Sequence, residues 1–277
     1  MDYRSLSDRV SEASAKVEAG FGWLELNPTG KKAAVLLHGV TGGKDDMLVL
    51  AEQYVAQGYA VFCPDLPGHG QSKMIDLPDF AALGKWFDAF THHLGRPIDL
   101  IVSSSYASAI IYQYLQMGFL SPNTHVILGC PTPKVAVMTI GLTRLGQLIP
   151  PRVSWYLYNI PPSRIFRTKY LYRGQDAASY KWLVESEKRK YWYIAPDVAP
   201  KLSAALFGTN NPYDLPPLPP AVQRRITVVI GERDNVINKA GRDYLHKIMP
   251  HATFVSAGPA GHILHFESVD SLVRQNP

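Results

Sequence analysis

The sequence is poor in cysteine and in long apolar stretches. Only two of the 277 residues are cysteines, Cys63 and Cys130, which is too few for a scaffold held together by disulfides. No run of about 18 uncharged apolar residues occurs, and the N-terminal segment has no apolar signal core. These absences argue against a secreted or membrane-spanning protein. They predict a cytoplasmic location and two buried, reduced thiols.

Several common site motifs are also missing. No Gly-x-Gly-x-x-Gly motif follows an expected strand, no Walker loop is present, and the histidines do not have metal-ligand spacing. Gly68-His69-Gly70 lies in a proline-containing turn rather than at the start of a helix. The sequence therefore predicts neither a cofactor nor a metal ion.

Short apolar runs alternate with segments of helical periodicity. The expected strands are residues 21–26, 31–38, 59–63, 98–102, 125–130, 225–230 and 252–257. The expected helices are residues 5–18, 44–58, 78–94, 105–115, 238–248 and 268–274. Strands that are apolar throughout are typical of a parallel sheet covered by helices on both faces. The predicted fold class is therefore α/β, with a mostly parallel central sheet.

Residues 134–221 interrupt this alternation. They contain no clear strand, several proline-rich breaks and 13 of the 30 aromatic residues. They also carry 12 Lys and Arg against 5 Asp and Glu, a net charge of +7, whereas the rest of the chain carries 16 basic and 18 acidic residues. We predict a first core segment (1–133), a helical lid insertion (134–221) and a second core segment (222–277).

The most informative local pattern is a strand, residues 98–102, that passes through three serines directly into a helix. A nucleophile on such a sharp turn requires small residues two positions before and two positions after it. Among the serines only Ser105 meets this condition, with Ser103 and Ala107 where the usual motif has glycines. The alternative interpretation is that the serine run only caps the helix.

A serine nucleophile needs a base, a carboxylate that orients the base, and donors that hold the oxyanion. His262, in a loop rich in glycine and proline, is the candidate base. Asp234, shortly after the strand 225–230, is the candidate carboxylate. The backbone amides of Val40 and Tyr106 are the candidate oxyanion donors.

Each of these assignments has an alternative. Asp234 and His262 also fit the ordinary roles of a turn aspartate and an exposed loop histidine. Rival candidates for the acid and the base are Glu232, Asp214 and His265. The two acids lie less favourably relative to a strand end, and His265 falls at the start of the last helical region, where packing or capping is the expected role.

Five motifs in this order resemble the α/β-hydrolase family. They are His38-Gly39, Asp65–Ser72, the turn at Ser105, Gly231–Asp234 and Gly261-His262. The resemblance covers nearly all of the chain except residues 134–221, which look like the variable lid of this family. It implies a serine hydrolase that cleaves a carboxylic ester or thioester through an acyl-enzyme. Carbon–carbon bond hydrolysis, acyl transfer and a non-catalytic ligand-binding role are alternatives on the same fold.

The composition of residues 134–221 suggests the substrate and the partners. Their aromatic side chains favour a small-molecule substrate with an apolar acyl group, although the same residues also suit the lid's own core. The basic excess is compatible with a solvated surface, an acidic carrier protein, an anionic membrane surface or an anionic substrate group. The run Lys188–Ile194 mixes basic and interfacial aromatic residues, which favours the protein or membrane partner. No nucleic-acid-binding fold accompanies the charge, so no nucleic-acid partner is predicted.

Overall fold

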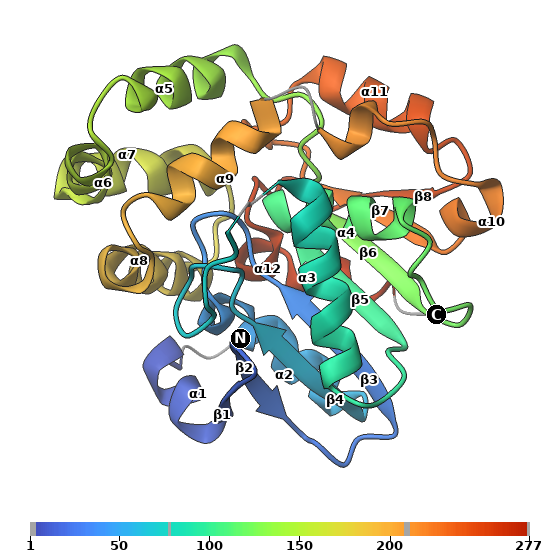
Figure 1. Cartoon of the computed structure of the whole chain (residues 1–277). Helices are drawn as coiled ribbons and strands as arrows, with labels where there is room; N and C mark the ends of the chain where they lie inside the picture. Colours follow the sequence, from blue (N-terminus) through green and yellow to red (C-terminus); the bar gives the residue numbers. More distant parts are fainter. Residues whose placement is uncertain (1–3, 77–78, 208–210, 276–277) are drawn as a thin grey trace.

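A single mixed sheet organises the chain. The computed structural model describes residues 4–76, 79–207 and 211–275, and within them the strands follow the order β1-β2-β4-β3-β5-β6-β7-β8 (Figure 1). The strands are β1 Ser14–Glu18, β2 Phe21–Leu26, β3 Lys32–Leu37, β4 Tyr59–Pro64, β5 Leu100–Ser104, β6 His125–Gly129, β7 Ile226–Ile230 and β8 Thr253–Ser256.

The strands from β3 to β8 run parallel, and β1 and β2 add an antiparallel edge. Every residue of β4, β5 and β7 is buried, which explains why their sequences are apolar throughout rather than alternating. The predicted fold class, with its mostly parallel sheet, is therefore confirmed. All parallel strands end at the same edge of the sheet, where the loops that follow them can meet.

Helices cover both faces of the sheet (Figure 1). The helices α3 (Phe80–His93) and α4 (Tyr106–Gln116) pack side by side on the near face. The helices α2 (Leu48–Ala56), α12 (Leu264–Glu267) and α13 (Val269–Val273) pack against one another on the other face. The remaining core helices are η1 (Lys44–Met47), η2 (Pro212–Asp214), α10 (Pro220–Gln223) and α11 (Lys239–Ile248).

Between β6 and η2, the described residues form five helices and no strand. They are α5 Val137–Gln147, α6 Pro151–Asn159, α7 Pro161–Leu171, α8 Ala177–Tyr193 and α9 Val198–Phe207. They gather at the upper left in Figure 1, beyond the ends of the parallel strands. Proline occupies the first turn of α6 and of α7, where its fixed φ and missing N–H fit a helix start. The division of the chain into a lid and two core segments stays a prediction.

The N-terminal segment differs from the prediction of one helix over residues 5–18. A short helix, α1 (Leu6–Glu12), is capped by Ser5, and the chain then forms strand β1. The two residues between β1 and β2, Ala19 and Gly20, have φ values of 51° and 88°. Positive φ at both positions gives the tight turn of a β-hairpin, so pairing with β2 outweighs the local helical pattern. Pro78, in the predicted third helix, lies outside the described residues, and α3 begins at Phe80.

Both cysteines are buried and free, as predicted. Cys63 lies in β4 and Cys130 directly after β6. Burial raises the pKa of both thiols, so they stay protonated. None of the described helices is long and apolar enough to cross a membrane.

Candidate active site

Ser105 occupies a strained turn between β5 and α4. Its φ of 54° and ψ of −116° are values that residues with a side chain rarely adopt, at a cost of roughly 1–3 kcal/mol. The Ser105 amide donates to the carbonyl of Gly129 at 2.7 Å, which ties the turn to the end of β6. The side chain therefore projects beyond the strand end, next to the positive N-terminus of α4.

The two departures from the glycine motif are accommodated within the turn. The Ser103 side chain is buried, and its hydroxyl lies 3.1 Å from that of Ser108 one turn into α4. This bond satisfies a hydroxyl that burial would otherwise leave unpaired. Ala107 is fully buried, and its methyl group adds little volume to the position. The serine and alanine therefore meet the same demand for small residues that glycine meets.

The structure brings Ser105, His262 and Asp234 together from the ends of three strands. The Ser105 Oγ atom lies 2.7 Å from Nε2 of His262, and Nδ1 of the same ring lies 2.7 Å from Oδ2 of Asp234. The three residues follow β5, β8 and β7, whose carboxyl ends share one edge of the sheet. A continuous path of hydrogen bonds therefore leads from the serine hydroxyl to a buried carboxylate.

The surroundings of Asp234 determine which atoms along this hydrogen-bonded path carry protons. Its Oδ1 atom accepts hydrogen bonds from the amides of Val236, at 2.7 Å, and Ile237, at 3.1 Å. Burial alone would raise the pKa of the Asp234 carboxyl, but His262 and these two amides outweigh it and hold the pKa below its usual value. An ionised carboxylate only accepts, so Nδ1 of His262 carries the proton and Nε2 is left to accept from Ser105.

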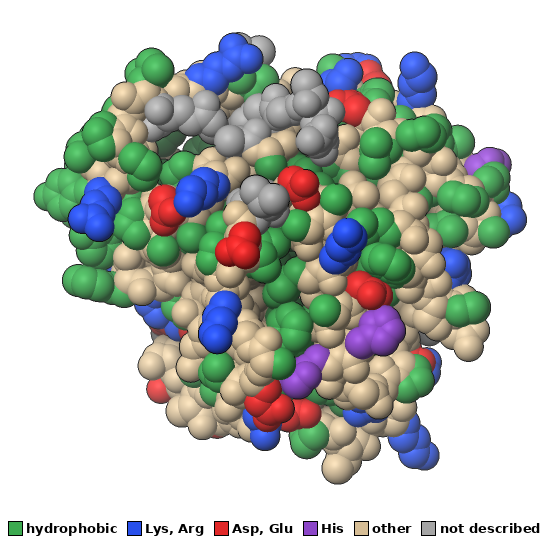
Figure 2. Space-filling model, viewed as in Figure 1, with side chains coloured by type: hydrophobic (Ala, Val, Ile, Leu, Met, Phe, Trp, Pro, Cys, Tyr) green, Lys and Arg blue, Asp and Glu red, His purple; other side chains and the backbone are tan. Residues whose placement is uncertain are grey.

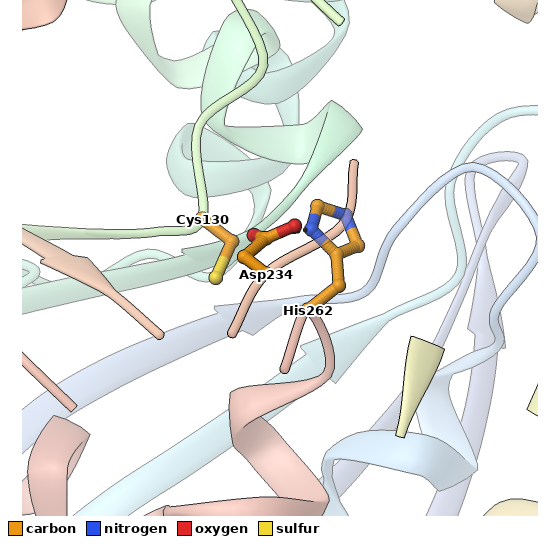
Figure 3. A group of neighbouring side chains, drawn as sticks. All are labelled: Cys130, Asp234 and His262. Atoms are coloured by element: carbon orange, nitrogen blue, oxygen red, sulfur yellow. Dashed lines mark hydrogen bonds and ion pairs between the residues drawn. The ribbon is translucent and has the colours of Figure 1, made fainter. Parts of the chain in front are cut away.

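Cys130 stands beside this path, with its thiol near the Asp234 carboxylate, which lies between Cys130 and His262 (Figure 3). The potential ligand atoms of these three residues all lie within 4.8 Å of one another. A metal ion would require a thiolate and an unprotonated nitrogen on the facing ring. Burial and the Asp234 charge instead raise the pKa of the thiol well above its usual value, and Nδ1 already bonds the carboxylate. The donor chemistry of this cluster fits hydrogen bonding rather than metal binding.

The two predicted oxyanion donors border Ser105. Tyr106 is the first residue of α4, so its amide belongs to the first turn, whose N–H groups have no partner within the helix. The loop of Val40 also lies close, because a Cβ atom placed on Gly39 would be 3.5 Å from the Cβ of Ser105. Both candidate donors are thus on segments that border Ser105.

His38 holds the peptide that carries the Val40 amide. Its Nε2 accepts from the amide of Leu66 at 3.0 Å, so Nδ1 carries the proton and donates to the Gly39 carbonyl at 2.8 Å. That carbonyl belongs to the same peptide as the Val40 N–H, and in a trans peptide the two groups point in opposite directions. Burial lowers the pKa of His38 well below its usual value, which keeps the ring in this neutral form. His38 therefore sets the direction of one candidate oxyanion donor.

The rival candidates lie elsewhere. His265 is buried behind the turn, where its Nδ1 lies 3.2 Å from the Ser104 hydroxyl, and burial lowers its pKa to about 3. Glu232 is exposed and accepts from Ser256 at 2.8 Å. Asp214 accepts from Tyr244 at 3.2 Å. His265 therefore packs as expected, and neither acid bonds His262.

The sequence did not reveal the residues of α7 that support the loops carrying Asp234 and His262. The Leu171 carbonyl accepts from the amide of His262 at 3.0 Å. The preceding residue, Tyr170, donates its hydroxyl to the carbonyl of Asn235 at 2.6 Å, and the Asn235 amide group donates back to the Tyr170 carbonyl at 3.1 Å. The end of α7 thus holds the loops of both His262 and Asp234. Contacts across more than 60 residues leave no local signal in the sequence.

A buried ion pair that the sequence did not reveal joins η1 to the loop after β4, and Tyr193 of α8 bonds both of its partners. Lys44 Nζ lies 2.6 Å from Oδ2 of Asp65, which is fully buried. The Tyr193 hydroxyl donates to Oδ1 of Asp65 at 2.5 Å, and Lys44 donates to the Tyr193 oxygen at 2.8 Å. Burial and the carboxylate raise the pKa of Tyr193, so it remains a donor. The two hydrogen bonds of Tyr193 therefore tie the end of α8 to η1 and to the loop after β4.

A cavity of about 340 Å³ lies between the segment after β6 and the helices α5 and α9. Its lining consists of Thr132, Pro133, Lys134, Val135, Ile140, Leu206 and Asn238. In the sequence, the first lining residue lies three residues after Gly129, whose carbonyl accepts from the Ser105 amide. The last lining residue lies four residues after Asp234. The Thr132 hydroxyl is buried and has no hydrogen-bond partner among the described residues. Four of the seven lining residues are apolar, and the polar ones are Thr132, Lys134 and Asn238.

A sequence model of the alpha/beta hydrolase family matches residues 34–275. No curated protein is similar enough in sequence to count as a relative.

Solved structures share the fold over most of the chain. An esterase from Exiguobacterium antarcticum is similar with a TM-score of 0.73 at 12% identity, covering 92% of this chain and 92% of that one. A 2-hydroxy-6-oxo-6-phenylhexa-2,4-dienoate hydrolase from Rhodococcus sp. strain RHA1 gives a TM-score of 0.69 at 19% identity, covering 94% of each chain. An esterase from Rhodococcus sp. ECU1013 gives 0.68 at 17% identity, covering 95% of this chain and 96% of that one. At these identities the likeness shows a common fold.

Proposed function

The chain belongs to the alpha/beta hydrolase family, and from this premise we propose that it is a serine hydrolase that cleaves a carboxylic ester or thioester with a hydrophobic acyl group. The observation that carries the proposal is the unbroken hydrogen-bonded path from Ser105 through His262 to Asp234. A strained serine at the N-terminus of a helix, facing the unprotonated nitrogen of a histidine, is suited to nucleophilic attack.

The proposed reaction proceeds in two halves. Ser105 attacks the acyl carbonyl carbon while Nε2 of His262 takes its proton, and the amides of Val40 and Tyr106 hold the oxyanion. Collapse of this intermediate releases the alcohol or thiol, which receives the proton from His262, and leaves an ester on Ser105. Water then attacks that ester with His262 as base, and the carboxylic acid is released. Asp234 remains ionised throughout and stabilises the imidazolium of each half-reaction.

The cavity supports an acyl substrate with an apolar body. Side chains such as Val135, Ile140 and Leu206 line it, and they favour a group that leaves water on binding. Its volume of about 340 Å³ lies at the lower end of the range typical for small-molecule sites. A medium-length acyl chain therefore fits it better than a long one.

A second candidate function is the hydrolysis of a carbon–carbon bond with the same three residues. The hydrolase from Rhodococcus sp. strain RHA1 acts, by its name, on a dienoate, which is a compound with a carboxylate. In this chain Lys134 and the unpaired hydroxyl of Thr132 line the cavity, and both can bond a carboxylate. These two residues are the specific observation in favour of the alternative.

A series of chromogenic esters and thioesters of increasing acyl length tests the proposed substrate class. We expect kcat/KM to pass through a maximum at medium chain length and to decline for acyl groups too long for the cavity. Each methylene accommodated in the cavity is expected to raise kcat/KM by roughly threefold to fourfold, which corresponds to about 0.8 kcal/mol. A rate independent of acyl length would contradict an apolar acyl site. Turnover only of a ring-fission dienoate would favour the second candidate.

A further inference from the structure

The outer side of the lid helices exposes an unusual amount of apolar surface. Figure 2 shows hydrophobic side chains gathered along the left edge, where Figure 1 places α5, α6 and α7. The exposed fraction reaches 83% for Leu148 and 86% for Trp192. We call this surface the apolar lid face, and its main members are Leu142, Leu145, Leu148, Tyr156, Phe166 and Trp192.

These residues are exposed although α6 and α7 already bury other side chains. On α5, Met138, Leu142 and Leu145 are spaced by four and three residues, so they share one side of the helix, and all three are exposed. On α6, Trp155 is buried while its neighbours Tyr156 and Leu157 are exposed. Packing of the lid core therefore does not account for the outer apolar side chains. Several large apolar side chains exposed on neighbouring helices typically mark an interaction surface.

Trp192 is exposed on a helix that contacts α6. It lies at the end of α8, and the preceding residue, Tyr191, accepts a hydrogen bond from the indole of Trp155 in α6 at 3.5 Å. The helix α6 contacts α5, α7 and α8. The four helices that carry these apolar residues are thus neighbours.

The charge on α5, α6 and α7 has one sign. Residues 137–171, which include α5, α6 and α7, contain five Lys and Arg and no Asp or Glu. Arg167 is engaged in a buried ion pair with Glu187 of α8. Arg144, Arg152 and Lys169 are exposed beside the apolar residues. This surface therefore offers apolar side chains surrounded by positive charge.

We propose that the apolar lid face docks on an anionic phospholipid bilayer. The apolar side chains would enter the boundary between headgroups and acyl chains, while the basic residues remain among the phosphates. An exposed tryptophan and leucine flanked by Arg and Lys are side chains suited to that boundary. An acidic carrier protein would match the positive charge of this surface, but it would not provide an apolar environment for Leu148 and Trp192. Docking does not require Ser105 and goes beyond the proposed hydrolysis.

Trp192 provides an intrinsic probe of docking. It is the exposed one of the five tryptophans, since Trp23, Trp86, Trp155 and Trp182 are all buried. We expect its fluorescence to shift to the blue when the full chain is mixed with vesicles of phosphatidylcholine and phosphatidylglycerol in equal parts. The shift should be absent with phosphatidylcholine alone and in Trp192→Phe. Co-sedimentation with the anionic vesicles provides the independent measure of binding.

Variants separate the apolar and the charged contributions. Two double variants are each expected to lower partitioning of the protein onto the anionic vesicles by roughly tenfold or more. They are Leu145→Glu with Leu148→Glu, and separately Arg144→Gln with Arg152→Gln. For the arginine pair, the size follows because each basic residue near an anionic bilayer contributes about fivefold. Lys247→Gln, which removes an exposed charge on α11, is the matched control and should bind normally. Ser105→Ala should also bind normally, which keeps this test separate from that of the proposed reaction.

The same measurements can overturn the inference. Equal binding of the double variants and the unaltered chain, or no binding to anionic vesicles, would contradict it. Binding of an acyl carrier protein in titration calorimetry, without binding to vesicles, would assign the face to an acidic protein instead.

Discussion

Replacing Ser105 by alanine is expected to lower kcat by a factor on the order of 10⁴ or more, because removal of the nucleophile leaves only binding and oxyanion stabilisation. The folded structure should persist, since the substitution removes one half-buried oxygen and Ala keeps the same turn. The measurement is kcat on the best ester of the acyl-length series, together with thermal unfolding of both proteins.

The neighbouring serine provides the control for this substitution. The Ser104 hydroxyl lies 3.2 Å from Nδ1 of His265 and so does not face His262. Ser104→Ala should therefore change kcat by much less than Ser105→Ala, although it leaves the His265 nitrogen unpaired. Equal losses in the two variants, or full turnover by Ser105→Ala, would remove Ser105 as the nucleophile.

The second large effect is expected for Asp234→Asn. The amide is nearly the same size, but it carries no charge and can present an N–H to Nδ1 of His262. That arrangement favours the tautomer with the proton on Nε2, which cannot accept the proton of Ser105. We expect kcat to fall by a factor on the order of 10⁴ at neutral pH. Glu232→Gln removes an exposed acid from the same loop and should leave kcat nearly unchanged.

The pH dependence of stability gives a further readout for Asp234. Its pKa is lower in the folded protein than in the unfolded chain. The ionised form therefore stabilises the fold above the ordinary carboxyl pKa of about 3.9, and this contribution is lost as the pH falls through the folded value. The free energy of unfolding of Asp234→Asn should thus decline less between neutral and acid pH than that of the unaltered chain. An identical decline in both proteins would contradict the proposed ionisation of Asp234.

Much of the core was predictable because its signals are local. Apolar runs without alternation predict buried parallel strands, and the fold class and the family are both confirmed. The small side chains two positions before and two positions after Ser105 predicted the sharp turn, although neither residue is a glycine. The meeting of Ser105, His262 and Asp234 followed from their positions after strands that end at one edge. Their catalytic roles stay predictions for the experiments above.

Other features depend on contacts between distant segments. Residues 14–18 form a strand because β2 is available for pairing, so the helical pattern of residues 5–18 misled the prediction. The bond between Leu171 and His262 and the ion pair of Lys44 and Asp65 join segments that share no sequence pattern. The basic charge of residues 134–221 was visible in the sequence, but only the structure shows exposed apolar side chains beside it.

The most direct test of the account is the site of reaction with a fluorophosphonate, which modifies a serine only when a base activates it. We expect a single adduct in the intact mass, located by peptide mapping on Ser105, absent in Ser105→Ala and formed much more slowly by Asp234→Asn. An adduct that persists in Ser105→Ala, or an unaltered chain that remains unlabelled, would contradict the claim that His262 and Asp234 activate Ser105.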